Sequence, residues 1–175
     1  MTKITIKKAL GEYFKWFDEM EDEDLPQIGV PLGASDGIFV GKENNGLVRW
    51  RPRVKDEYFD LIQLEINSGI TVHQSVKDLL NSWWFGFLRI QIEDLYFELD
   101  PIIPGNYKSS FLLRLLGYRD AHEGKLDYIP IGMSMETGIL LVINNESGEV
   151  CTEDYELHTY SVIANSLEEF LIAGT

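Results

Sequence analysis

The chain has 175 residues, 45% of them apolar and 12% aromatic, so it is long enough to form one domain with a sizeable core, and we expect a single domain over residues 1–175. Its 29 acidic and 15 basic residues give a net charge of −14. A field of that sign repels nucleic-acid phosphates and anionic lipid headgroups and attracts basic partners. We therefore expect no nucleic-acid partner, although acidity can also serve solubility alone.

The cysteine content and the apolar runs indicate a cytoplasmic protein. Cys151 is the only cysteine, so no disulfide can form within the chain, and a reducing compartment fits best. The first residues, Met1–Lys8, carry positive charge but no apolar segment of the signal-peptide type. The longest apolar runs, such as 139–143, are much shorter than the roughly 20 residues that span a bilayer. We expect no insertion into a membrane.

The first half of the chain begins with a helical pattern. Apolar residues at one-face spacing predict an amphipathic helix over about 4–20, formed by Ile6, Leu10, Tyr13, Phe14 and Phe17. An acidic stretch at 18–24 ends it before Pro26. Short β-prone runs among glycines and asparagines then predict strands, with a tight turn at Asn45–Gly46, and a short helix follows them; the strands are 38–40, 47–50 and 61–66 and the helix is about 74–84.

The second half combines clearer strands with two helices. Alternating residues over 87–99 predict a strand pair that turns at Glu93–Asp94, and a helix over about 108–122 should bury Phe111, Leu112, Leu115 and Leu116. Strands are then expected at 128–132, 138–143 and 149–151, and a closing helix within 161–173. This order predicts an α+β fold, with a mixed or antiparallel β-sheet flanked by helices.

The residue types used in catalysis lie in no known motif. His73, His122 and His158 do not have zinc-ligand spacing, and there is neither a phosphate-binding glycine loop nor a nucleophile elbow. Cys151 follows a turn in a β-prone run and is better interpreted as a packing thiol than as a nucleophile. A carboxylate-based hydrolase would need two acids about 5–10 Å apart in a pocket. We expect no enzyme, no catalytic residue, no cofactor and no metal.

Two other segments have alternative interpretations. The basic segment 49–55 contains Trp50 and superficially resembles a nucleic-acid strip, but in so acidic a chain we expect it to pair with neighbouring carboxylates. The aromatic run 82–88 is expected to supply core residues; an exposed Trp84 or Phe85 would instead anchor an interface.

The order of these features resembles the Syd family of bacterial SecY-interacting proteins, within the wider SUKH superfamily. The resemblance lies in the segments Gly46–Pro52, Ile70–His73, Leu112–Tyr118, Leu141–Val150 and Ala164–Leu171. It implies a SUKH/Syd-like single domain whose acidic concave surface binds the basic cytosolic loops of SecY, peripherally on the cytoplasmic face of the inner membrane. The wider superfamily also implies an alternative, an immunity protein that neutralises a cognate basic toxin such as a nuclease.

The expected partner-binding residues are the acids of the two densest clusters. They are Asp18, Glu19, Glu21, Asp22, Glu23 and Asp24 in the first, and Glu93, Asp94, Glu98 and Asp100 in the second. Either cluster could instead be simply solvated. The sequence does not indicate an oligomeric state.

Overall fold

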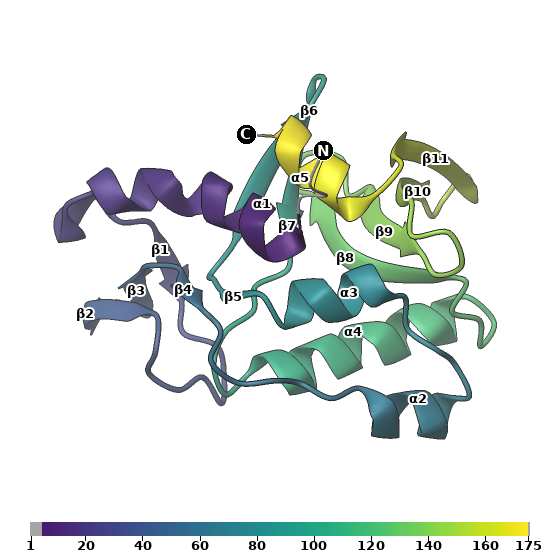
Figure 1. The fold of residues 1–175 in the computed structure, drawn as a ribbon, viewed down its shortest axis with the longest axis horizontal. Coiled ribbons are helices and arrows are strands. Elements are labelled where there is room, and N and C mark those ends of the chain that lie inside the picture. The colour runs from purple at the N-terminus through teal and green to yellow at the C-terminus, as the bar shows by residue number, and fades with distance from the viewer. Residues whose placement is uncertain (1–4, 175) are drawn as a thin grey trace.

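The computed structural model describes residues 5–174, in which helices and three antiparallel sheets surround one buried core (Figure 1). This arrangement confirms the expected α+β class. The helices are α1 (Ile6–Tyr13), η1 (Phe14–Glu19), η2 (Asp22–Asp24), α2 (Ile62–Ser68), α3 (Gln74–Leu80), α4 (Tyr107–Ala121) and α5 (Leu167–Ala173), of which η1 and η2 are 3-10 helices.

The largest sheet has six strands in the order β11-β10-β9-β8-β7-β6, so each strand pairs with its neighbour in the chain. Its strands are β6 (Leu88–Ile92), β7 (Leu95–Leu99), β8 (Tyr128–Ser134), β9 (Leu140–Asn144), β10 (Val150–Asp154) and β11 (Thr159–Ala164). A small sheet of order β1-β3-β2 and a pair β4-β5 complete the strands: β1 (Gln27–Gly29), β2 (Phe39–Asn44), β3 (Leu47–Trp50), β4 (Arg53–Val54) and β5 (Trp83–Trp84).

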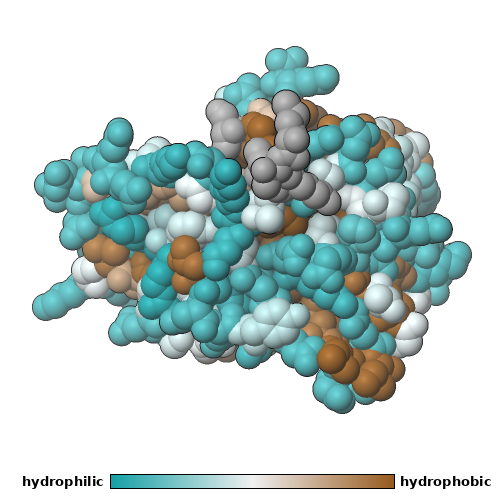
Figure 2. Space-filling model, viewed as in Figure 1, coloured by the Kyte–Doolittle hydropathy of each residue, from teal (hydrophilic) through white to brown (hydrophobic). Residues whose placement is uncertain are grey.

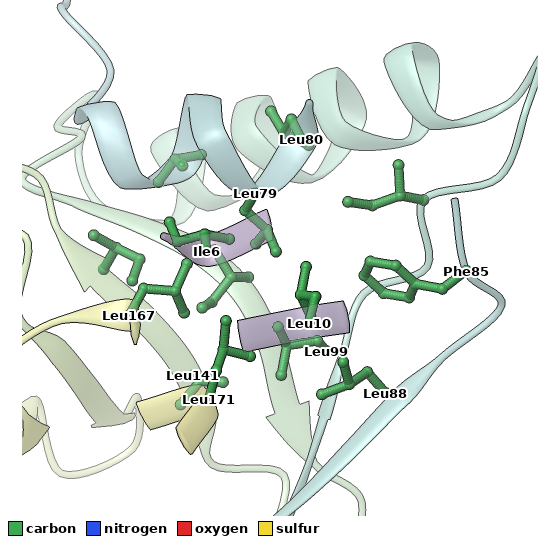
Figure 3. Close-up of a cluster of buried hydrophobic side chains, with 14 of the residues drawn as sticks. Ile6, Leu10, Leu79, Leu80, Phe85, Leu88, Leu99, Leu141, Leu167 and Leu171 are labelled. Carbon is green, nitrogen blue, oxygen red and sulfur yellow. The ribbon is translucent and has the colours of Figure 1, made fainter. Parts of the chain in front are cut away.

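One face of the six-stranded sheet is covered by α1, α3 and α5. Figure 3 shows Ile6 and Leu10 of α1 in one cluster with the strand residues Leu99 and Leu141 and the α5 residue Leu171. All five are buried, none more than 2% exposed. This apolar cluster fixes α1 against the sheet, and with it the 3-10 turn that follows.

The opposite face of the central strands is covered by α4. Successive strand residues point to opposite faces, so Asp100, next to the core residue Leu99, faces away from α1. Arg114 of α4 reaches it, with 2.8 Å between Nε and Oδ2. Tyr118 of α4 donates to Glu153 of β10 at 2.6 Å. The sheet is therefore covered on both faces at its centre, whereas the outer face of β6 and β7 carries the exposed side chains of Arg89, Gln91 and Tyr96.

Two of the segments that carry the family resemblance lie against each other. Asn145, in the turn between β9 and β10, accepts from the backbone N–H of His73 at 2.8 Å and donates to the carbonyl of Thr71 at 2.9 Å. His73 is the N-cap residue of α3, and its ring accepts a hydrogen bond from the N–H of Ser75. These motif residues therefore have a structural role: they join the start of α3 to the β9–β10 turn.

The strand predicted at 61–66 is wrong, because α2 occupies this segment. Asp60 accepts from the N–H of Ile62 at 2.9 Å, which favours a helical start, and Gly69 ends the helix with a φ of +69°. A short apolar run does not distinguish strand from helix by periodicity alone. The helix predicted at 74–84 also ends early, since Trp83 and Trp84 form β5.

The closing helix is shorter than expected, because the first part of 161–173 belongs to β11. Ser166 is the true helix start: its hydroxyl accepts from the N–H of Glu169 at 3.2 Å. The β-branched pair Val162–Ile163 before it favours a strand. The first predicted helix, 4–20, continues as the 3-10 helix η1 after Tyr13, and residue 4 lies outside the described residues.

The burial predicted for α4 is wrong for one residue. Phe111 and Leu115 are buried and Leu116 is half-buried, but Leu112 is 38% exposed. Figure 2 shows a surface that is mostly hydrophilic, with a hydrophobic patch over α2 at the lower right. Across residues 5–174, every helix is too short or too polar to cross a bilayer.

Candidate protein-binding groove

An open groove of about 1040 Å³ lies between the α1–η1 helix and the β6–β7 hairpin. We call it the helix–hairpin groove. It is lined by Glu12, Tyr13, Lys15, Trp16, Glu19, Arg89, Gln91, Tyr96, Phe97, Glu98, Met135, Glu136 and Gly174. Both walls are built from segments that pack on the same core.

The helical wall follows from the periodicity of α1 and η1. Ile6, Leu10 and Phe17 face the core, so Glu12, Lys15, Trp16 and Glu19, at spacings of three and four, lie together on the other side of the helix. The Tyr13 hydroxyl donates to the carbonyl of Arg89 at 2.8 Å and so joins this wall to β6. Burial raises the pKa of Tyr13, which keeps this donor protonated.

The strand wall follows from the alternation of the hairpin. Ile90, Phe97 and Leu99 are buried in the core, so Arg89, Gln91, Tyr96 and Glu98 point outward. Met135 and Glu136, in the turn between β8 and β9, complete the wall. Tyr96 is 47% exposed and Met135 67%, so the groove contains apolar surface as well as charge.

The charges in the groove sum to an excess of carboxylates. Four acids line it, and its two basic side chains already pair with two of them: Lys15 with Glu12, and Arg89 with Glu98 at 2.9 Å. The Lys15 ammonium holds the pKa of Glu12 below its usual value. Within residues 5–174, neither Glu19 nor Glu136 pairs with a basic side chain. The groove therefore offers two uncompensated carboxylates to a cation.

Of the ten acids predicted to bind a partner, the structure brings Glu19 and Glu98 together in this groove. Asp18, Glu21, Asp22, Glu23 and Asp24 are exposed along η1, η2 and the two residues between them, and they do not line the groove. Glu93 and Asp94 are exposed at the tip of the β6–β7 hairpin. Asp100 lies elsewhere, between α4 and the sheet beside Arg114; burial raises its pKa, and Arg114 partly offsets this effect.

The basic segment 49–55 holds the acidic segment 18–24 in place. Arg51 donates to the carbonyls of Phe17 and Met20 and to the carboxylate of Asp22. Arg49 donates twice to the carbonyl of Glu23, at 3.2 and 3.0 Å. The predicted pairing is confirmed, but its main acceptors are backbone carbonyls rather than carboxylates. η1 and η2 are thus tied to β3 and the residue after it, and among residues 5–174 most of their carboxylates have no basic partner.

Trp16, Tyr96, Met135 and Glu136 were not identified from the sequence as binding residues. They come from three segments about 40–120 residues apart, and their proximity depends on how α1 packs across the sheet. Trp16 offered a local signal, because it falls outside the apolar stripe of its helix. Trp84 and Phe85, considered as possible interface residues, are 2% and 0% exposed, so the core interpretation is confirmed.

A second polar cluster surrounds Glu153, which is only 2% exposed. Its carboxylate accepts from Tyr118 at 2.6 Å and from Tyr160 at 3.1 Å, and it contacts His122 Nε2. The phenolic pKa values of both tyrosines are raised, first by burial and also by Glu153. This network satisfies a buried charge and ties α4 to β10 and β11.

Two further observations bear on chemistry. Cys151 is buried and burial raises its pKa, which confirms the packing interpretation. Across residues 5–174, no three His, Cys, Asp or Glu side chains gather as metal ligands.

Comparison with known proteins identified two similar chains. Protein Syd of Idiomarina loihiensis is 26% identical over 128 residues, which cover 71% of this chain and 69% of the relative. Protein Syd of Aliivibrio salmonicida is 21% identical over 173 residues, which cover 96% of this chain and 94% of the relative. No protein-family model matches the chain. The chain is thus an α+β protein that is similar, at low identity, to two proteins named Syd.

Proposed function

We propose that this chain is a non-catalytic protein-binding module that, like the Syd family it resembles, binds basic cytosolic loops of SecY. The observation that carries the proposal is the helix–hairpin groove, in which Glu19 and Glu136 have no basic partner among the described residues. A basic loop would supply the missing cations. The two similar proteins named Syd support this choice of partner class.

The net charge of −14 supports the proposal in a second way. Charges outside the groove raise the rate of encounter with a cationic loop, whereas charges inside it lengthen the lifetime of the complex. Both effects weaken with salt, because the Debye length falls to about 8 Å at physiological ionic strength. Such binding would place the protein peripherally on the cytoplasmic face of the inner membrane.

The direct test is binding to detergent-solubilised SecY over a series of salt concentrations. We expect association at low ionic strength that weakens as salt increases. The double variant Glu19→Gln/Glu136→Gln should bind about tenfold more weakly, since it removes two charges close to the bound cation. A matched control is Glu43→Gln/Glu156→Gln, which makes the same charge change at two exposed sites outside the groove.

Two outcomes would overturn the proposal. Absence of binding to SecY at low salt excludes this partner. Equal weakening by the groove variant and its control shows that net charge, rather than the groove, determines the binding.

A further inference from the structure

We propose that the helix–hairpin groove selects arginine over lysine in the basic segment that it binds, through the exposed rings of Trp16 and Tyr96. This inference rests on the proposed function, because it specifies the partner chemistry of the same groove. Net charge alone would attract arginine and lysine equally, whereas this groove would distinguish between them.

Trp16 is more exposed than the other three tryptophans of the chain. Trp50 and Trp84 are buried and Trp83 is half-buried with its indole N–H bonded to the carbonyl of Lys7. Trp16, by contrast, is 42% exposed and lines the groove. It is held from within the helical wall, with its ring centroid 4.1 Å from that of Phe17. Tyr96 is 47% exposed on the other wall. Each wall therefore presents one exposed aromatic ring.

Rings beside carboxylates discriminate between the two basic side chains. A guanidinium is planar and weakly hydrated, so it can stack on a ring while its N–H groups donate to a carboxylate. A lysine ammonium is compact and strongly hydrated, and it pairs with a carboxylate as a point charge. The exposed side chain of Met135 lines the same groove and adds apolar surface that the aliphatic part of either basic side chain can cover, so the discrimination rests on the rings.

Arg89, on the strand wall, already shows the arginine arrangement, with a ring that lies outside the groove lining. The guanidinium of Arg89 lies 5.0 Å from the centroid of the Phe87 ring, while its Nε donates to Glu98 at 2.9 Å. Lys15, on the helical wall, forms an ion pair with Glu12. An arginine of a partner can repeat the Arg89 arrangement with Trp16 or Tyr96 as the ring and Glu19 or Glu136 as the carboxylate.

The test compares two synthetic peptides of equal length and charge, one whose basic residues are all arginine and one in which each is lysine. We expect the arginine peptide to bind the full chain about two- to fivefold more tightly, the range for an exposed cation–π contact. Trp16→Leu keeps an apolar side chain but removes the ring, so it should reduce the ratio of the two affinities toward one. Tyr96→Leu should act in the same way from the other wall. It keeps the inference testable if the first variant unfolds.

The control is Tyr58→Leu, which removes a ring that is 70% exposed and lies outside the groove. This variant should preserve the preference for arginine. Equal affinities for the two peptides would overturn the inference, as would a preference that survives both groove variants. The SecY measurement separates the two proposals: SecY binding without arginine preference contradicts this inference alone, whereas arginine preference without SecY binding contradicts the proposed partner alone.

Discussion

Gly148 lies directly against the imidazole of His73: a Cβ on Gly148 would stand 2.3 Å from Cε1 and 2.7 Å from Nε2 of the ring. The glycine also has a φ of +78°, which other residues adopt at a cost. We expect Gly148→Ala to lower the free energy of unfolding by about 2–4 kcal/mol. The variant would strain the backbone, and its Cβ would also overlap the His73 ring. Urea denaturation measures this loss.

Gly138→Ala separates the two contributions. Gly138 has a similar φ of +73°, but a Cβ there would meet nothing within 4 Å. This variant should lose only the conformational cost, about 1–2 kcal/mol. Equal losses for the two variants would show that contact with His73 is unimportant.

The second prediction concerns the buried carboxylate of Glu153. Tyr118→Phe removes the hydroxyl that donates to it at 2.6 Å and leaves the charge with one donor fewer. We expect a loss of about 1–3 kcal/mol in the free energy of unfolding. The control is Tyr155→Phe, whose exposed hydroxyl donates to the carbonyl of Ala121 at 3.3 Å and should matter little. A larger loss in the control would contradict the assigned role of the network.

A third prediction concerns Lys55, which is 6% exposed with its Nζ 4.2 and 3.9 Å from the ring centroids of Trp84 and Tyr107. Burial lowers its pKa to about 8. Between about pH 8 and pH 10 the unfolded chain keeps a proton that the folded chain has released, so stability should rise with pH, by about 1–2 kcal/mol. Tyr107 and Tyr118, whose pKa values are raised in the folded chain, oppose this trend above about pH 10. There their phenols lose protons in the unfolded chain but keep them in the folded one, so stability falls as pH increases.

The measurement is the free energy of unfolding of the native chain and of Lys55→Met across this pH range. Methionine keeps an unbranched apolar side chain between the rings but has no proton to release. The rise should therefore be absent or much smaller in the variant. An identical rise in both proteins would assign it to other groups.

The fourth prediction distinguishes the hairpin tip from the groove. Glu93→Gln/Asp94→Asn removes two exposed charges at the tip, outside the groove lining. Remote charges change the rate of encounter more than the stability of the complex, so this variant should lower the association rate for a basic partner and leave the dissociation rate nearly unchanged. Surface plasmon resonance measures both rates. Faster dissociation would place the tip inside the binding surface.

The sequence predicted best those elements whose pattern is local. The β6–β7 hairpin followed from alternation around Glu93–Asp94, and the β9–β10 turn from its asparagines and glycine. The errors lie where a cap or a tertiary contact decides between helix and strand. Asp60 and Gly69 define α2 within an apolar run, and Ser166 divides β11 from α5.

The residues of the groove were harder to predict from the sequence than the fold. Acid abundance identified Glu19 and Glu98, but it also identified Asp100, which the structure places beside Arg114. Trp16 and Tyr96 become neighbours of one groove only through the packing of α1 on the sheet. Local patterns carry no record of such contacts between distant segments.

The hydrogen bonds from Arg49 and Arg51 to the carbonyls of Phe17, Met20 and Glu23 have a consequence for binding thermodynamics. They immobilise the backbone of the acidic segment without neutralising most of its side chains. A partner therefore meets a preorganised array of negative charge, and little conformational entropy is lost in ordering that backbone on association. A disordered acidic tail of the same composition would bear that loss at every encounter.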